Sequence, residues 1–98
     1  MLKESAKPIA NPLLVFRDEF DDWAILFDPD TGDGYGLNPV SAFIWKLLDG
    51  GHTIQDILQE LQKECEDIPE NAEKEIKDFV DDLIKKGYAG FEVKSGLI

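Results

Sequence analysis

Cysteine and histidine are nearly absent from this sequence, and their scarcity excludes much of the chemistry available to small proteins. The 98 residues include one cysteine and one histidine. A single cysteine cannot form an internal disulfide, and one cysteine with one histidine cannot complete a zinc site. We therefore expect no metal site, and the cysteine content agrees with a reducing compartment.

Basic residues and long apolar runs are also scarce. Lysine and arginine number 10 against 21 aspartates and glutamates, which leaves a formal net charge of -11. Affinity for nucleic acid depends largely on lysine and arginine neutralising phosphates, so this balance opposes a nucleic-acid partner. No apolar run is long enough to cross a bilayer, and the amino terminus has no signal-peptide pattern. We expect a cytoplasmic protein of one domain with no membrane partner.

What the sequence does contain is a set of short strand patterns followed by strong helical periodicity. Branched and aromatic residues, separated by acidic turns, predict strands over residues 13–16, 23–27 and 35–37. Apolar spacings of three and four predict helices over residues 39–49, 53–66 and 72–86. The expected fold class is α+β, with a three-stranded antiparallel meander followed by three α-helices.

The chain termini carry weaker patterns. Residues 1–11 are polar and include Pro8 and Asn11, so we expect a flexible lead-in that gives way to ordered structure near residue 12. Residues 89–98 are expected to form a tail, and the strand-like content of Phe91-Glu92-Val93 suggests that it lies on a free sheet edge. The domain itself is expected over residues 12–88.

Two candidate chemical sites have ordinary structural explanations. Cys65 continues the apolar stripe of the second predicted helix while His52 precedes that helix, so the two should be far apart, and we expect no catalytic residues. The acidic segment DPDTGDG, residues 28–34, resembles a calcium loop, but its glycine and glutamate positions do not fit one. We therefore interpret it as an ordinary acidic hairpin turn.

The segment from Tyr35 to Gly50 resembles the PqqD family of small peptide-binding proteins. The resemblance lies in Leu37-Asn38, Ile44-Trp45 and Leu48-Asp49-Gly50. It extends over about residues 12–88 through further matches in the second and third helices: Ile54, Ile57, Leu61, Glu75-Ile76, Phe79-Val80, Leu83 and Gly87-Tyr88. The chain also has the size of a free-standing family member, such as those of SynChlorMet-type cassettes.

This resemblance implies a winged-helix-like fold and a function without catalysis or cofactor. The chain would act as a peptide chaperone: it would bind the leader peptide of a ribosomally made precursor and present it to a radical-SAM enzyme. In the family the leader lies antiparallel along the third strand, in a groove between that strand and the third helix. Carried over residue by residue, this implies a site of Tyr35, Gly36 and Leu37 on the strand and Ile76, Val80 and Leu83 on the helix. The sequence leaves open which helix residues face the groove and which face the core.

Two other functions compete with this interpretation. An acyl or peptidyl carrier protein is also small and acidic, and Ser41 would be its attachment point, although carriers are all-helical and lack the predicted strands. A winged-helix regulator would use the third helix to bind DNA, but acidic residues outnumber lysines on that helix.

Overall fold

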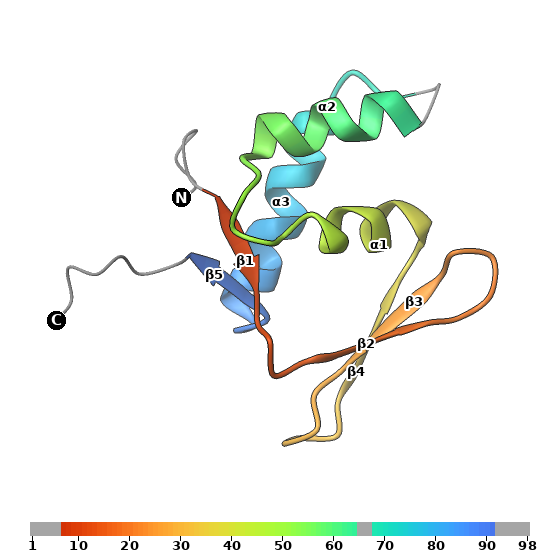
Figure 1. Ribbon diagram of the computed structural model, residues 1–98, viewed down its shortest axis with the longest axis vertical. Helices are drawn as coiled ribbons and strands as arrows, with labels where there is room; N and C mark the ends of the chain where they lie inside the picture. Colours follow the sequence, from red (N-terminus) through yellow and green to blue (C-terminus); the bar gives the residue numbers. More distant parts are fainter. Residues whose placement is uncertain (1–6, 65–67, 92–98) are drawn as a thin grey trace, which may run out of the picture.

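The computed structural model describes residues 7–64 and 68–91, and it contains two small sheets and three helices (Figure 1). The elements in chain order are β1 Pro8–Ala10, β2 Val15–Asp18, β3 Ala24–Phe27, β4 Gly34–Leu37, α1 Pro39–Lys46, α2 Ile54–Glu64, α3 Ala72–Lys85 and β5 Ala89–Phe91. The α+β fold expected from the sequence is confirmed, since β2, β3 and β4 form an antiparallel meander in that order and the three helices follow it.

The helix ends follow from the capping residues. The Asn38 side chain accepts a hydrogen bond from the Ser41 N–H at 2.8 Å, with Pro39 at the first helical position of α1. Before α2, the Thr53 hydroxyl and the Asp56 carboxylate accept each other's backbone N–H, at 3.1 and 3.0 Å. Helix α1 ends at Lys46, three residues before the predicted end, because the chain turns at Leu47 towards β1.

Helix α3 ends in a Schellman motif. Gly87 has φ +80°, a conformation that side chains disfavour, and its N–H donates to the Ile84 carbonyl. The Tyr88 N–H donates to the Leu83 carbonyl at 2.8 Å. This turn directs the chain into β5 and holds the Tyr88 ring near β4.

The second sheet is the main difference from the sequence prediction. Pro8–Ala10, expected in the flexible lead-in, forms β1 and pairs antiparallel with Ala89–Phe91. The Asn11 side chain donates to the Gly87 carbonyl at 3.0 Å, which further ties β1 to the end of α3. Of the expected strand in the tail, Phe91 lies in β5, which pairs with β1 and not with the edge of the meander. Residues 92 and 93 of that expected strand lie outside the described residues.

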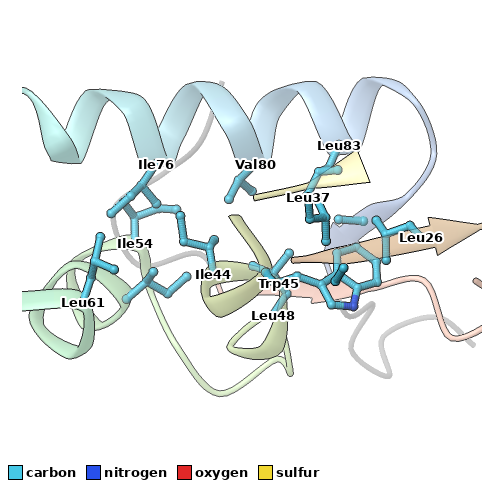
Figure 2. Close-up of a cluster of buried hydrophobic side chains, with 14 residues drawn as sticks. Leu26, Leu37, Ile44, Trp45, Leu48, Ile54, Leu61, Ile76, Val80 and Leu83 are labelled. Atoms are coloured by element: carbon cyan, nitrogen blue, oxygen red, sulfur yellow. The ribbon is translucent and has the colours of Figure 1, made fainter. Parts of the chain in front are cut away.

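The core lies between the inner face of the meander and the three helices (Figure 2). Leu26 and Leu37 face Leu83 of α3, while Trp45 and Leu48 close the core near the end of α1. Each of these side chains is buried. The packing fixes α3 beside β4, and this arrangement positions the candidate site. The predicted place of Cys65 on α2 lies outside the described residues.

Candidate functional site

Strand β4 has one paired edge and one free edge. Along the paired edge, Tyr35 lies opposite Leu26 of β3 and Leu37 lies opposite Ala24 of β3. Within residues 7–64 and 68–91, no strand pairs with the opposite edge of β4. Unpaired backbone groups on such an edge can accept an additional strand from another chain.

The Tyr35 side chain joins this edge to the end of α3. Its ring makes an edge-to-face contact with Tyr88, with centroids 5.8 Å apart, and the Lys86 Nζ lies 5.7 Å from its centroid. Its hydroxyl donates to the Asp82 carboxylate at 3.4 Å, which is long for an O–H donor, so this bond is weak. A ligand can replace it at little cost.

Burial and charge both act on this cluster. Burial raises the pKa of the Tyr35 phenol above its ordinary value, and the negative charge of Asp82 raises that pKa further. The hydrogen bond to Asp82 also raises the pKa of the Lys86 ammonium group. At neutral pH the cluster therefore presents a neutral phenol beside an ion pair, with 3.1 Å between the Lys86 Nζ and the Asp82 Oδ2.

Helix α3 presents different residues to the core and to the β4 edge. The three helix residues named by the family resemblance, Ile76, Val80 and Leu83, are 2%, 0% and 0% exposed and belong to the core. The flank of the helix nearer β4 carries Glu75, Phe79 and Asp82 at spacings of four and three. Of these, Glu75 is exposed, while Phe79 and Asp82 are half-buried.

A cavity opens at the far end of the same helix flank. It has a volume of ≈ 310 Å³ and lies between the start of α1, the first half of α3 and the segment before α3. Its lining is mainly apolar and includes Val40, Ser41, Ile44, Ile68, Ile76 and Phe79. Asn38 and Glu75 contribute polar groups to the wall. Ile76 thus reaches the cavity from the core side, and Phe79 connects the cavity to the flank.

The free edge and the cavity lie along the same two elements, β4 and α3. From Tyr35 to Asn38, β4 advances three residues, or roughly 10 Å at 3.3 Å per residue. From Asp82 to Glu75, α3 returns seven residues, or roughly 10 Å at 1.5 Å per residue. Tyr35 contacts Asp82, and Asn38 and Glu75 line the same cavity, so the two elements run antiparallel at matching lengths. We call this the β4–α3 surface: Tyr35, Gly36, Leu37, Glu75, Phe79 and Asp82.

Sequence reasoning named the strand residues of this surface, whereas the helix residues that it named lie in the core, and only Ile76 of them also lines the cavity. Phe79 was expected inward with Ile76 and Val80 because all three are apolar. The available signal was angular: Phe79 lies about 60° from Ile76 around the helix at 100° per residue, at the margin of the apolar stripe. Asp82, Lys86 and Tyr88 carried no such signal, because their place beside Tyr35 depends on how α3 packs.

The other candidate sites have structural roles where they are described. The Asp28 carboxylate accepts the Asp30 N–H at 2.9 Å, and the Asp28 N–H donates to the Asp33 carbonyl, as in an ordinary hairpin turn. The His52 ring bonds the Asp49 carboxylate at 2.9 Å, and this bond lowers the pKa of Asp49. Among the described residues, no group of three possible metal ligands occurs, and no helix is long and apolar enough to cross a membrane.

Comparison with known proteins adds the family. The model of the family described as coenzyme PQQ synthesis protein D (PqqD) matches residues 24–89. A lasso peptide synthetase B1, solved in complex with the leader peptide, is 30% identical with a TM-score of 0.71, over 86% of this chain and 98% of that chain. None of the curated proteins compared with the chain matches it.

Two further solved structures share the fold. TbiB1, in complex with the TbiA(beta) leader peptide, has a TM-score of 0.70 at 24% identity, over 88% of this chain and 99% of that chain. The heterocyclase TruD has a TM-score of 0.60 at 19% identity, over 86% of this chain and 11% of its own. The same fold therefore occurs as a nearly whole chain and as a small part of a larger enzyme.

Proposed function

Because this chain belongs to the PqqD family, we propose that it binds the leader segment of a precursor peptide along the β4–α3 surface. The observation that carries the proposal is the free edge of β4 beside an exposed flank of α3, with an apolar cavity at the end of both. The lasso peptide synthetase B1, similar over 86% of this chain, is a complex with a leader peptide and supports the same ligand class.

Backbone pairing alone would not hold a peptide here. About four strand hydrogen bonds at about 1 kcal/mol net each roughly offset the lowest estimate of the association cost, about 4 kcal/mol. Micromolar binding requires about -8 kcal/mol. The remaining free energy has to come from apolar side chains of the peptide, and the cavity is the place for them. At ≈ 310 Å³ it lies near the lower limit of ligand pockets, so it fits one or two side chains.

The proposed orientation fixes which part of the peptide enters the cavity. A segment antiparallel to β4 starts beside Leu37 and Asn38 and ends beside Gly34. Its first residues then fill the cavity between α1 and α3, while its last residues leave past the hairpin of residues 28–33. The part of the precursor that follows the leader would emerge at that hairpin, away from the helices.

The proposal also corrects the helix half of the expected site. Phe79 and Asp82 replace Val80 and Leu83 as the peptide-facing residues, and Ile76 contributes only through the cavity wall. Tyr35, Gly36 and Leu37 keep their proposed role through the backbone of β4. The Tyr35 ring remains as a side wall, held by its contacts with Tyr88 and Lys86, while its weak bond to Asp82 can be replaced by the peptide.

We further propose that the chain is an accessory protein and not an enzyme, that it acts in the cytoplasm, and that a radical-SAM enzyme receives the bound peptide. The family supports the accessory role. The radical-SAM partner rests on the resemblance seen in the sequence. The carrier alternative is disfavoured, because the chain has a three-stranded sheet and Ser41 lies in the first turn of α1 with its N–H bound by Asn38.

A backbone NMR titration with the synthetic leader of the precursor encoded beside this chain tests the site and the orientation together. Chemical shift changes should concentrate at residues 34–41, 75, 79 and 82. A spin label at the start of the leader should broaden signals around the cavity, and one at its end should broaden signals near residues 33–35. A scrambled leader is the control. Changes confined to α2, or reversed broadening, would refute the site or the orientation respectively.

A further inference from the structure

The meander has a second face, which points away from the helices and from the core. In β3, Ala24 and Leu26 are buried, so the alternate residues Ile25 and Phe27 point outward. Directly paired residues share a face, and the register pairs Val15 with Phe27 and Arg17 with Ile25. We call this the outer sheet face, and it comprises Val15, Arg17, Trp23, Ile25, Phe27, Gly34 and Gly36.

The outer sheet face is apolar and accessible. Val15 is 44% exposed, Trp23 52%, Ile25 38% and Phe27 39%. These four side chains gather on two neighbouring strands of a small protein, whereas isolated exposed apolar residues are common on any surface. An exposed group of apolar side chains that includes Trp and Phe, with an Arg beside them, has the composition of a protein interface.

Glycine keeps the β4 side of this face flat. The register places Gly36 beside Ile25 and Gly34 beside Phe27. A Cβ at Gly36 would meet no atom within 4 Å, and neither glycine has a positive φ, so neither crowding nor backbone conformation requires glycine there. The missing side chains leave the backbone accessible next to Ile25 and Phe27, as close contact with a partner needs.

Acidic turns border the face at both ends. One turn carries Asp18, Glu19, Asp21 and Asp22, and the other carries Asp28, Asp30 and Asp33. Lys46 lies 3.8 Å from Asp18, and Arg17 is the one basic residue of the face itself. A second copy of this chain, stacked with its strands aligned in either direction, would therefore meet acidic turns with acidic turns. Such contacts repel, so a second copy is disfavoured.

We propose that the outer sheet face docks a second protein whose contact surface is apolar at its centre and bordered by lysine or arginine. The docking face lies on the opposite side of the sheet from the core and α3, so it does not overlap the α3 flank or the cavity, and it meets the β4–α3 surface only at Gly36 of β4. The chain can then hold a peptide and a protein partner at the same time. The inference stands on the sheet register, the exposure of its residues and the charge of its turns, and does not require the proposed peptide site.

The probe is a synthetic amphipathic helix of leucine and lysine (the lysine peptide), which has the apolar and basic surface expected of the partner. The control is its twin, the same helix with glutamate in place of every lysine. The lysine peptide should shift the emission of the exposed Trp23 to shorter wavelength, whereas Trp45 is already buried. NMR shifts on the wild-type protein should concentrate at residues 15–17 and 23–27. Raising the salt concentration from 50 to 500 mM should weaken binding severalfold. Equal binding of the twin, or shifts confined to α3, would overturn the proposal.

A variant pair separates this face from general attraction to an acidic protein. Ile25→Thr with Phe27→Thr removes apolar surface, keeps the charge and retains residues suited to strands. This double variant should weaken binding of the lysine peptide at least tenfold. Phe91→Thr on β5, which also changes an exposed apolar position, should leave that binding unchanged. Equal affinities of the two variants would overturn the proposal. Self-association in sedimentation velocity that the double variant abolishes would also overturn it, in favour of a second copy.

Discussion

Alanine substitutions at two positions of α3 distinguish the core face of the helix from its proposed peptide-facing flank. Leu83 and Phe79 lie one turn apart, but Leu83 is fully buried and Phe79 is half-buried beside the cavity. Both changes to alanine favour the helical conformation, so helix propensity does not distort the comparison. The structure predicts that Leu83→Ala affects folding and that Phe79→Ala affects binding.

The magnitudes follow from burial. Leu83→Ala should lower the free energy of unfolding by about 2–5 kcal/mol, because the removed side chain leaves a cavity in a closed core. The melting temperature of a domain of this size should then fall by at least about 8 °C. Full burial of a phenylalanine contributes about 1.5–3 kcal/mol. A peptide that covers the exposed part of Phe79 gains at most roughly 1 kcal/mol, so Phe79→Ala should raise the Kd by up to about fivefold.

Fluorescence anisotropy with the labelled leader peptide measures the Kd, and urea unfolding measures stability. Binding is recorded at 15 °C, where the unfolding curve shows the fraction of each variant that is folded. Per folded molecule, Leu83→Ala should bind within about twofold of the wild type. If Leu83→Ala weakened binding while Phe79→Ala left it unchanged, the assignment of the α3 faces would be refuted, and the helix residues implied by the family resemblance would be restored.

Two other predictions concern charge and partnership. The raised pKa of Tyr35 means that the folded protein holds the phenolic proton when the unfolded chain has released it, so stability should fall as pH rises above about 10. Tyr35→Phe should remove this part of the pH dependence in urea unfolding between pH 9 and 11, and identical slopes would contradict the Tyr35 environment. A radical-SAM enzyme paired with this chain should modify the full precursor several times faster in its presence. It should modify a leaderless precursor equally with or without the chain, and any acceleration of the leaderless form would argue against leader delivery.

The elements of this fold were largely predictable because each follows from local physical chemistry. Asn38, Thr53 and Gly87 mark helix ends through caps that involve only neighbouring residues. Alternating and helical apolar spacings located the meander and the three helices. The second sheet was not predictable in this way, since β1 and β5 have three residues each and meet from opposite ends of the described chain.

The candidate site likewise has a part that the sequence indicated and a part that depended on packing. Tyr35, Gly36 and Leu37 were identified as peptide-binding residues because one short segment resembles the PqqD family. The free edge of β4 is consistent with peptide binding there. The helix half depended on which face of α3 meets the core. The family resemblance implied three apolar residues, and sequence spacing does not distinguish the centre of an apolar stripe from its margin. The cavity involves α1, α3 and the segment before α3, and no local sequence pattern predicts that these segments lie together.

By itself, the sequence determined the family, the fold class, the strand that offers a free edge and the unfavourable charge for nucleic acid. The fold class and the charge follow from composition, period and local capping, whereas the family and its strand follow from the resemblance of a short segment. Only the tertiary structure decided that Asp82 contacts Tyr35 of β4, that Phe79 lines the cavity, that Ile76, Val80 and Leu83 fill the core, and that Ile25 and Phe27 remain exposed on the outer sheet face. The physical reason is that burial is a property of the packed whole: an apolar side chain favours any surface that excludes water, and the arrangement of the sheet and helices selects which one it reaches.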